Sequence, residues 1–181
     1  IDRLQGPGLG AVEREPMTPR LTTEVSTLGD LLIRAAALHP DRLGLVLPSA
    51  RATFAQLQDG AFRVARALHA MGIRRGEHVA LLIPNSIEFA EALFGTMLAG
   101  CVAVPLNARH RAAELGYIIA NAEAAAILTS RHADDPIDFL ALLDEAIPSS
   151  AAAPALQHIA LIRGEGTARA LGRAEFLARA D

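Results

Sequence analysis

The chain has 181 residues, of which 51% are hydrophobic and 20% are charged. This balance excludes bulk disorder, and no apolar run approaches the length that a membrane-spanning helix needs. We therefore expect no transmembrane segment. The 17 Lys-plus-Arg positions are all arginine and are scattered along a chain of net charge −3, so we also expect no nucleic-acid partner.

A single cysteine, Cys101, makes an internal disulfide impossible, and this sparing use of cysteine fits a reducing compartment. The first residues lack the charged, apolar and small-residue order of a secretory signal peptide. We therefore expect a cytoplasmic protein.

The chain divides into a leader and a patterned region. Residues 1–26 contain several glycines and prolines with little periodicity, which predicts a loose leader. Residues 27–181 carry the helix and strand patterns of one α/β unit. Thr27 is placed to cap a first helix, which the His39-Pro40 pair ends.

A hairpin and a long helix follow. An apolar run at residues 43–47, a Pro-Ser turn and residues 51–53 predict two antiparallel strands. Thr53 and Gln56 form a capping-box pair, so the return strand is expected to lead directly into a helix that reaches Gly72.

The centre of the chain alternates apolar runs with helical segments. The runs cover residues 79–83, 102–106 and 125–129, and two amphipathic segments separate them. Strands that read as unbroken apolar runs are buried on both faces, and crossover helices cover both faces of a parallel sheet. The pattern predicts an α/β fold with an open, mainly parallel sheet, helices on both faces and a small β-hairpin near the N-terminus.

The first crossover helix is predicted from its caps and its apolar stripe. Asn85 and Glu88 form a capping-box-like pair at its start, and Gly100 ends it. The stripe that we expect to pack on the sheet consists of Phe89, Leu93, Phe94, Met97 and Leu98. The second crossover helix is shorter and covers residues 114–121.

The pattern is looser after the third apolar run. An Asp-Asp-Pro run at residues 134–136 is expected to introduce a helix over residues 139–147. Residues 157–162 predict a fourth parallel strand, and residues 174–180 predict a terminal helix.

Four short motifs follow one another along the chain. They are a Thr-aromatic-x-x-Leu helix start, a Gly-x-x-x-Gly-Glu-x-Val-Ala turn and strand, a Pro-Asn-Ser helix cap and an Ala-Gly-x-x-x-x-Pro-Leu-Asn block, at residues 53–57, 72–80, 84–86 and 99–107. In this order and spacing, they resemble the N-terminal region of the acyl- and aryl-CoA synthetases of the adenylate-forming superfamily. The resemblance covers most of residues 27–162. Asn107 favours acyl-CoA ligases over peptide-synthetase domains, which usually carry Asp there.

The resemblance implies a two-step reaction. ATP and a carboxylic acid, which we expect to be a fatty acid, give an acyl-adenylate and pyrophosphate, and the thiol of coenzyme A then displaces AMP. The full-length enzyme would use ATP, Mg²⁺ and coenzyme A. The sequence contains neither the family's Ser/Thr/Gly-rich phosphate loop nor any lysine. We therefore expect an N-terminal fragment that stops before the phosphate-binding loop, has no catalytic residue and is inactive by itself.

Two other interpretations stay open. The chain can be a stand-alone, non-catalytic α/β binding or interaction module, since it lacks every catalytic block of the family. A Rossmann-like nucleotide domain is a weaker alternative, because its first βα turn would be Pro84-Asn85-Ser86, without the glycines that let a pyrophosphate approach. A fragment with an incomplete sheet can also expose an apolar edge and form homo-oligomers.

Polar residues that follow two of the predicted strands are the candidates for ligand contacts. Arg109, His110 and Arg111 follow the second apolar run, at the end where open α/β sheets bind ligands, although such a charged run is typical of a solvated helix start. Arg131 and His132 follow the third run. The resemblance implies an arginine in this region on the 3′-phosphate of coenzyme A in some relatives, and Arg131 is our candidate for that contact.

The other chemically active residues favour structural roles. The six histidines show no metal-ligand spacing, so no metal site is predicted. Cys101 begins a strand and is expected to be an inert core thiol. The Gly-rich stretch 164–167 lacks a third glycine in dinucleotide register and predicts a solvent turn, and no Gly-x-Ser-x-Gly elbow marks a nucleophilic serine.

Overall fold

A four-stranded parallel sheet forms the centre of the computed structural model, which describes residues 27–180. Its strands are β3 (His78–Leu82), β4 (Val102–Pro105), β5 (Ala124–Ser130) and β6 (His158–Arg163). They lie in the order β4-β3-β5-β6, and each neighbouring pair is parallel. The predicted parallel core, including its fourth strand, is therefore confirmed.

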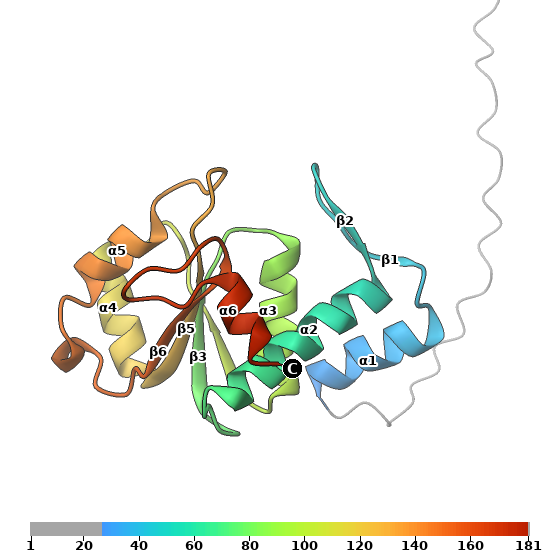
Figure 1. Ribbon diagram of the computed structural model, residues 1–181, viewed down its shortest axis with the longest axis horizontal. Helices are drawn as coiled ribbons and strands as arrows, with labels where there is room; N and C mark the ends of the chain where they lie inside the picture. Colours follow the sequence, from blue (N-terminus) through green and yellow to red (C-terminus); the bar gives the residue numbers. More distant parts are fainter. Residues whose placement is uncertain (1–26, 181) are drawn as a thin grey trace, which may run out of the picture.

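Helices cover both faces of the sheet (Figure 1). One face packs against α2 (Phe54–Ala70), α3 (Ile87–Leu98) and α6 (Arg173–Ala178), and the other against α4 (Ala112–Asn121) and α5 (Phe139–Ala146). This three-layer arrangement confirms the predicted fold class. None of the helices in residues 27–180 is long and apolar enough to cross a membrane.

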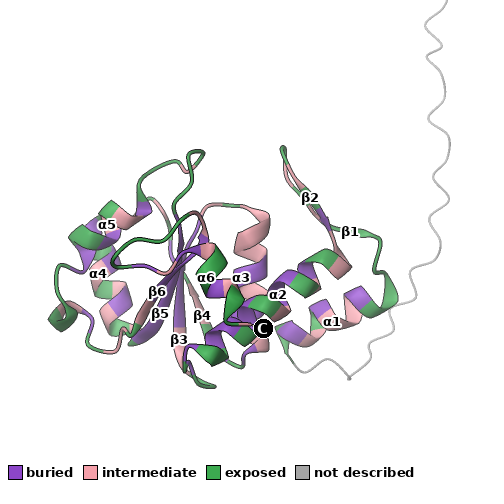
Figure 2. Ribbon diagram, viewed as in Figure 1, coloured by how far each residue is buried: buried purple, intermediate pink, exposed green. Residues whose placement is uncertain are grey.

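The central strands are buried because both of their faces carry apolar side chains (Figure 2). In β3, Val79 and Leu81 join the core under α2 and α3, whereas Ala80 and Leu82 join the core under α4 and α5. Successive residues of a strand point to opposite faces, so an unbroken apolar run serves two cores at once. By contrast, β4 borders the sheet, and its Val102 stays 45% exposed.

The N-terminal part of the fold packs on the outer side of α2 and α3. Here α1 (Leu28–Leu38) begins with a capping box made by Thr27 and Asp30. Strands β1 (Leu43–Val46) and β2 (Arg51–Thr53) form a separate antiparallel pair, which projects from the molecule in Figure 1. The predicted small hairpin is therefore confirmed.

Helix α2 starts directly at the end of β2. The Thr53 hydroxyl accepts from the Gln56 amide at 3.2 Å, and the Gln56 side chain accepts from the Thr53 amide at 2.9 Å. Two amides at the start of the helix are thereby satisfied, as the sequence predicts. The predicted leader, residues 1–26, lies outside the described residues.

The cap of α3 is Ser86, so the prediction that Asn85 caps this helix is wrong. The Ser86 hydroxyl accepts from the Phe89 amide at 3.1 Å, and Glu88 lies inside the first turn rather than at the capping-box position. Both Asn and Ser are favourable caps, so the sequence does not distinguish them. The packing of the helix against the rest of the fold decides which of the two residues becomes the cap.

The buried face of α3 also differs from the predicted stripe. Phe89, Leu93 and Leu98 of the stripe pack against the sheet core as predicted but are only partly buried, whereas the buried residues of the helix are Glu91, Ala92, Gly95 and Thr96. The reason is the close approach of α2. A Cβ on Gly95 would lie 2.7 Å from the backbone oxygen of Ala61, so only small residues fit at this crossing.

Candidate functional site

The carboxyl ends of the parallel strands meet at one edge of the sheet, where open α/β sheets bind ligands. A buried hydrogen bond joins two of these ends, because the Thr129 hydroxyl of β5 donates to the Leu82 carbonyl of β3 at 2.8 Å. The loop that leaves β5, residues 131–138, and the end of β6 carry the polar side chains of this edge.

Asp135 is the centre of these polar contacts. Its side chain is only 3% exposed. One carboxylate oxygen, Oδ2, accepts from the Ser130 hydroxyl and from the His132 amide, both at 2.7 Å, and Oδ1 accepts from Arg163 at 3.3 Å. Hydrogen bonds to an ionised acceptor are among the strong ones, so this carboxylate holds the loop after β5 to the end of β6.

Arg163 connects Asp135 to two further residues. It ends β6, and its guanidinium lies 3.0 Å from Nδ1 of His132 and 3.9 Å from the carboxylate of Glu88 in the first turn of α3. Arginine has no acceptor, so the His132 nitrogen accepts this bond. We call these five residues, Glu88, Ser130, His132, Asp135 and Arg163, the Asp135 cluster.

Arg131 lies next to this cluster, and its backbone is held from two sides. Its amide donates to the Arg163 carbonyl at 2.9 Å. Gly164 has a φ of +104°, and a Cβ there would overlap the carbonyl oxygen of Arg131. The side chain of Arg131 is exposed, and within the described residues its guanidinium has no hydrogen bond or ion pair.

A pocket of about 370 Å³ lies at the same loop. Its lining includes Arg131, His132 and Asp135 on the polar side and Ile137 and Phe139 on the apolar side. Asp135 is paired with Arg163, and Asp138, which also lines the pocket, accepts from the Ala141 amide, so the positive charge that this pocket offers to a ligand is the guanidinium of Arg131, which is unpaired among the described residues. A forked guanidinium suits a phosphate or a carboxylate.

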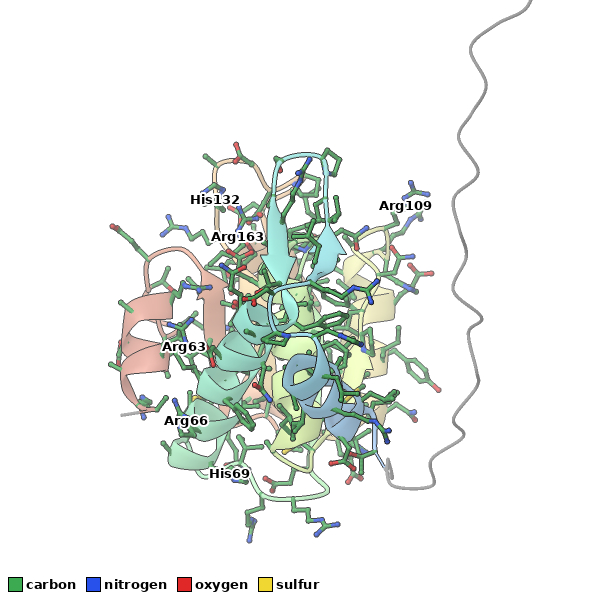
Figure 3. The ribbon with its side chains drawn as sticks, turned by 90° about the vertical axis from the view of Figure 1, so that its right-hand side faces the viewer. Arg63, Arg66, His69, Arg109, His132 and Arg163 are labelled. Carbon is green, nitrogen blue, oxygen red and sulfur yellow. The ribbon has the colours of Figure 1, made fainter. Side chains whose placement is uncertain are left out.

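The structure separates Arg109, His110 and Arg111 from this pocket. They follow β4, and β3 lies between β4 and β5 in the sheet. Figure 3 shows Arg109 beside α4, on the opposite side of the view from His132 and Arg163. The contacts of this run are local: the Arg111 amide donates to Glu114 at 2.8 Å, and His110 lies 3.7 Å from the same carboxylate. The run therefore serves as the start of α4.

Two other titratable groups are buried. Burial raises the pKa of Glu91 above its ordinary value, although the guanidinium of Arg173 at 3.7 Å works in the opposite direction. Burial also raises the pKa of the Cys101 thiol, with a smaller contribution from the charge of Glu77. Both groups lie in helix and core packing rather than at the pocket. A raised thiol pKa makes Cys101 less reactive.

Metal-binding side chains do not gather in the described part of the chain. Across residues 27–180, no three His, Cys, Asp or Glu residues are close enough to hold an ion. Glycines 164 and 166 lie in a turn in which the Thr167 hydroxyl accepts from the Arg169 and Ala170 amides, both at 3.2 Å. This local bonding agrees with the predicted solvent turn.

Asp135 and Arg163 are site residues that the sequence did not predict. Asp135 was expected only to introduce α5, but Asp138 is the residue that caps this helix, at 3.0 Å from the Ala141 amide. A signal was present, since an Asp follows β5 and an Arg ends β6. Using it requires knowing that β5 and β6 are neighbours in the sheet.

Comparison with known proteins places this fold in a family. A family model described as AMP-binding enzyme matches residues 32–173. Long-chain-fatty-acid–CoA ligase FadD13 of Mycobacterium tuberculosis (strain ATCC 25618 / H37Rv) is 37% identical over 106 residues, which are 58% of this chain and 21% of that relative. The salicyl-AMP ligase / salicyl-S-ArCP synthetase of the same strain is 36% identical over 138 residues, which are 74% of this chain and 24% of that relative.

A solved structure agrees with the sequence relatives. The crystal structure of the anthranilate CoA ligase AuaEII in complex with anthranoyl-AMP superposes with a TM-score of 0.71 at 25% identity, over 84% of this chain and 27% of that one. The chain thus spans about a quarter of the length of these proteins. The family match covers far more than half of this chain and replaces the Rossmann-like alternative. The chain belongs to the AMP-binding enzyme family.

Proposed function

We propose that this chain is the N-terminal α/β part of an ATP-dependent acyl-CoA ligase, which converts a carboxylic acid through an acyl-adenylate into a coenzyme A thioester. The observation that supports this most is the family match over residues 32–173, together with relatives that are named as fatty acyl-CoA and salicyl-AMP ligases. We expect a soluble, cytoplasmic enzyme that acts on a carboxylic acid, with fatty acids as the first class to test.

We assign two roles to residues 27–180 in such an enzyme: a structural scaffold and one ligand contact. We propose that Arg131 binds the 3′-phosphate of coenzyme A, because its guanidinium is exposed, unpaired among the described residues and held at the carboxyl edge of the sheet. Mg²⁺ would neutralise the ATP phosphates in such an enzyme. No cluster in residues 27–180 fits that ion, so we assign none of these residues to it.

The first experiment tests the ligase activity. A longer protein that carries this chain should catalyse carboxylate-dependent exchange between ATP and pyrophosphate and then form a coenzyme A thioester. The 181-residue chain alone should show neither reaction. An absence of exchange with every fatty or aromatic acid tested would contradict the ligase proposal and favour a binding module. Exchange by the chain alone would contradict the proposal that the activating groups lie elsewhere.

The second experiment tests the phosphate contact. Replacing Arg131 with Gln should leave pyrophosphate exchange unchanged and raise the KM for coenzyme A by about tenfold to a hundredfold, the equivalent of one charged hydrogen-bonding pair. The KM for dephospho-coenzyme A, which lacks the 3′-phosphate, should not change. Arg109→Gln is the matched control, since it removes an exposed arginine from the loop of another strand. Equal effects of the two substitutions would refute the assignment.

A further inference from the structure

We propose that Asp135 is a positioning residue for Arg131, with Arg163 as its counter-ion, and that the Asp135 cluster fixes the direction in which the Arg131 guanidinium meets an anionic ligand. This inference rests on the proposed function, since it concerns the same coenzyme A contact. It adds two residues that belong to no motif of the sequence.

Asp135 holds both chain neighbours of Arg131. Ser130 and His132 are the two chain neighbours of Arg131, and both donate to the same oxygen, Oδ2 of Asp135, at 2.7 Å. A single carboxylate oxygen thus fastens the residues directly before and after Arg131. The Arg131 amide is fastened separately, to the Arg163 carbonyl at 2.9 Å. Together these bonds set the direction of the Cα–Cβ bond of Arg131.

The side chain of Asp135 is buried. A carboxylate with a 3% exposed side chain is costly unless it is paired and hydrogen-bonded, and here it accepts three bonds. Loss of this acceptor would leave the Ser130 hydroxyl and the His132 amide without their partner. The loop would then settle in another arrangement, because the buried Ser130 hydroxyl would have to find a new partner.

Charges within the Asp135 cluster are paired with one another. The cluster contains two carboxylates, Glu88 and Asp135, and the guanidinium of Arg163 lies between them. Arg163 is therefore already engaged, and it screens the negative charge of Asp135, which would otherwise repel a phosphate in the adjoining pocket. The positive charge that remains available belongs to Arg131. A binding group that is held by a supporting layer of hydrogen bonds loses less freedom when the ligand arrives.

A purely structural role for Asp135 predicts something different. In that case, its replacement lowers stability without a specific effect on the phosphate. Asp135→Asn keeps the shape of the side chain but removes the charge and one acceptor oxygen. Thr53→Ala is the stability control, since it removes a helix cap in another part of the fold.

The test uses the longer protein that carries this chain, with adenosine 3′,5′-bisphosphate as the binding probe and coenzyme A and dephospho-coenzyme A as substrates. Asp135→Asn should weaken probe binding and raise the KM for coenzyme A, each by about tenfold, with no change for dephospho-coenzyme A or pyrophosphate exchange. The double variant with Arg131→Gln should be no weaker than Arg131→Gln alone, because Asp135 acts through Arg131. Thr53→Ala should lower the Tm and leave the probe affinity unchanged.

Several results would overturn the inference. These are a wild-type affinity for the probe in Asp135→Asn, an additive loss in the double variant, or no probe binding by the wild-type protein. If Asp135→Asn does not fold, Ser130→Ala removes only one donor to Oδ2 and should weaken probe binding about threefold, and an unchanged affinity would overturn the inference as well. Pyrophosphate exchange by the wild-type protein reports separately on the proposed ligase activity.

Discussion

Replacing Gly95 with Ala should destabilise the protein, although alanine is the better helix former. Gly95 lies in the middle of α3, where the helix crosses α2. A Cβ at this position would lie 2.6 Å from the Cβ of Val64 and 2.7 Å from the backbone oxygen of Ala61. Carbon atoms in contact are normally about 3.5–4.0 Å apart, so the two helices must separate by on the order of 1 Å.

The change in the free energy of unfolding is the sum of two opposing effects. Alanine gains about 1 kcal/mol over glycine inside a helix. Overpacking a core costs about 1–3 kcal/mol, and we expect the upper end because a backbone oxygen cannot rotate away as a side chain can. The net loss in the free energy of unfolding is then about 2 kcal/mol, which lowers the Tm of a chain of this size by roughly 4–8 °C.

Thermal unfolding followed by circular dichroism measures this loss. Gly29→Ala is the matched control, because its closest new contact would be the flexible end of the Leu98 side chain, at 2.9 Å, and the nearest backbone atom, the Leu98 Cα, would lie at an ordinary 3.6 Å. That variant should stay within about 0.5 kcal/mol of the wild type, as expected for a contact that can adjust. If Gly95→Ala melts at or above the temperature of the control, the close crossing of α2 and α3 described above is wrong.

Two further predictions concern a cap and a buried acid. In urea unfolding, Ser86→Ala should lose about 1 kcal/mol and Asn85→Ala little, since only the serine hydroxyl caps α3; equal losses would contradict the cap assignment. Burial raises the pKa of Glu91 above 4.5, so the folded state binds this proton more tightly than the unfolded chain and loses stability as the pH rises above that value. The stability of the wild type relative to Glu91→Gln should therefore fall as the pH rises from 4.5 through the raised pKa of the folded state, and a pH-independent difference would refute this cause.

Features that depend on neighbouring residues in the chain were predictable. The capping box of Thr53 and Gln56 joins residues three positions apart, and the runs that form β3 and β5 are apolar because both faces are covered. Such signals are local, and the structure confirms them. They sufficed for the fold class and for the order of the elements along the chain.

Features that depend on how elements meet in space were not predictable. The most deeply buried face of α3 is set by the close approach of α2, so Gly95 is buried there while the predicted Leu93 packs on the core only partly buried. The order of the strands in the sheet likewise cannot be predicted from the sequence of any one segment. Because β3 lies between β4 and β5, Arg109 and Arg131 lie in loops that are not neighbours at the sheet edge. Because β5 and β6 are neighbours, Asp135 and Arg163 come into contact.

The outer side of β4 has a practical consequence for work with this chain. No strand within residues 27–180 pairs with that side, so its amides and carbonyls can accept another strand. Pro105 lacks an amide hydrogen and blocks only the far end. Samples of the chain alone are therefore prone to edge-to-edge association. A lysine in place of the exposed Val102 is the first substitution to try for keeping them monodisperse.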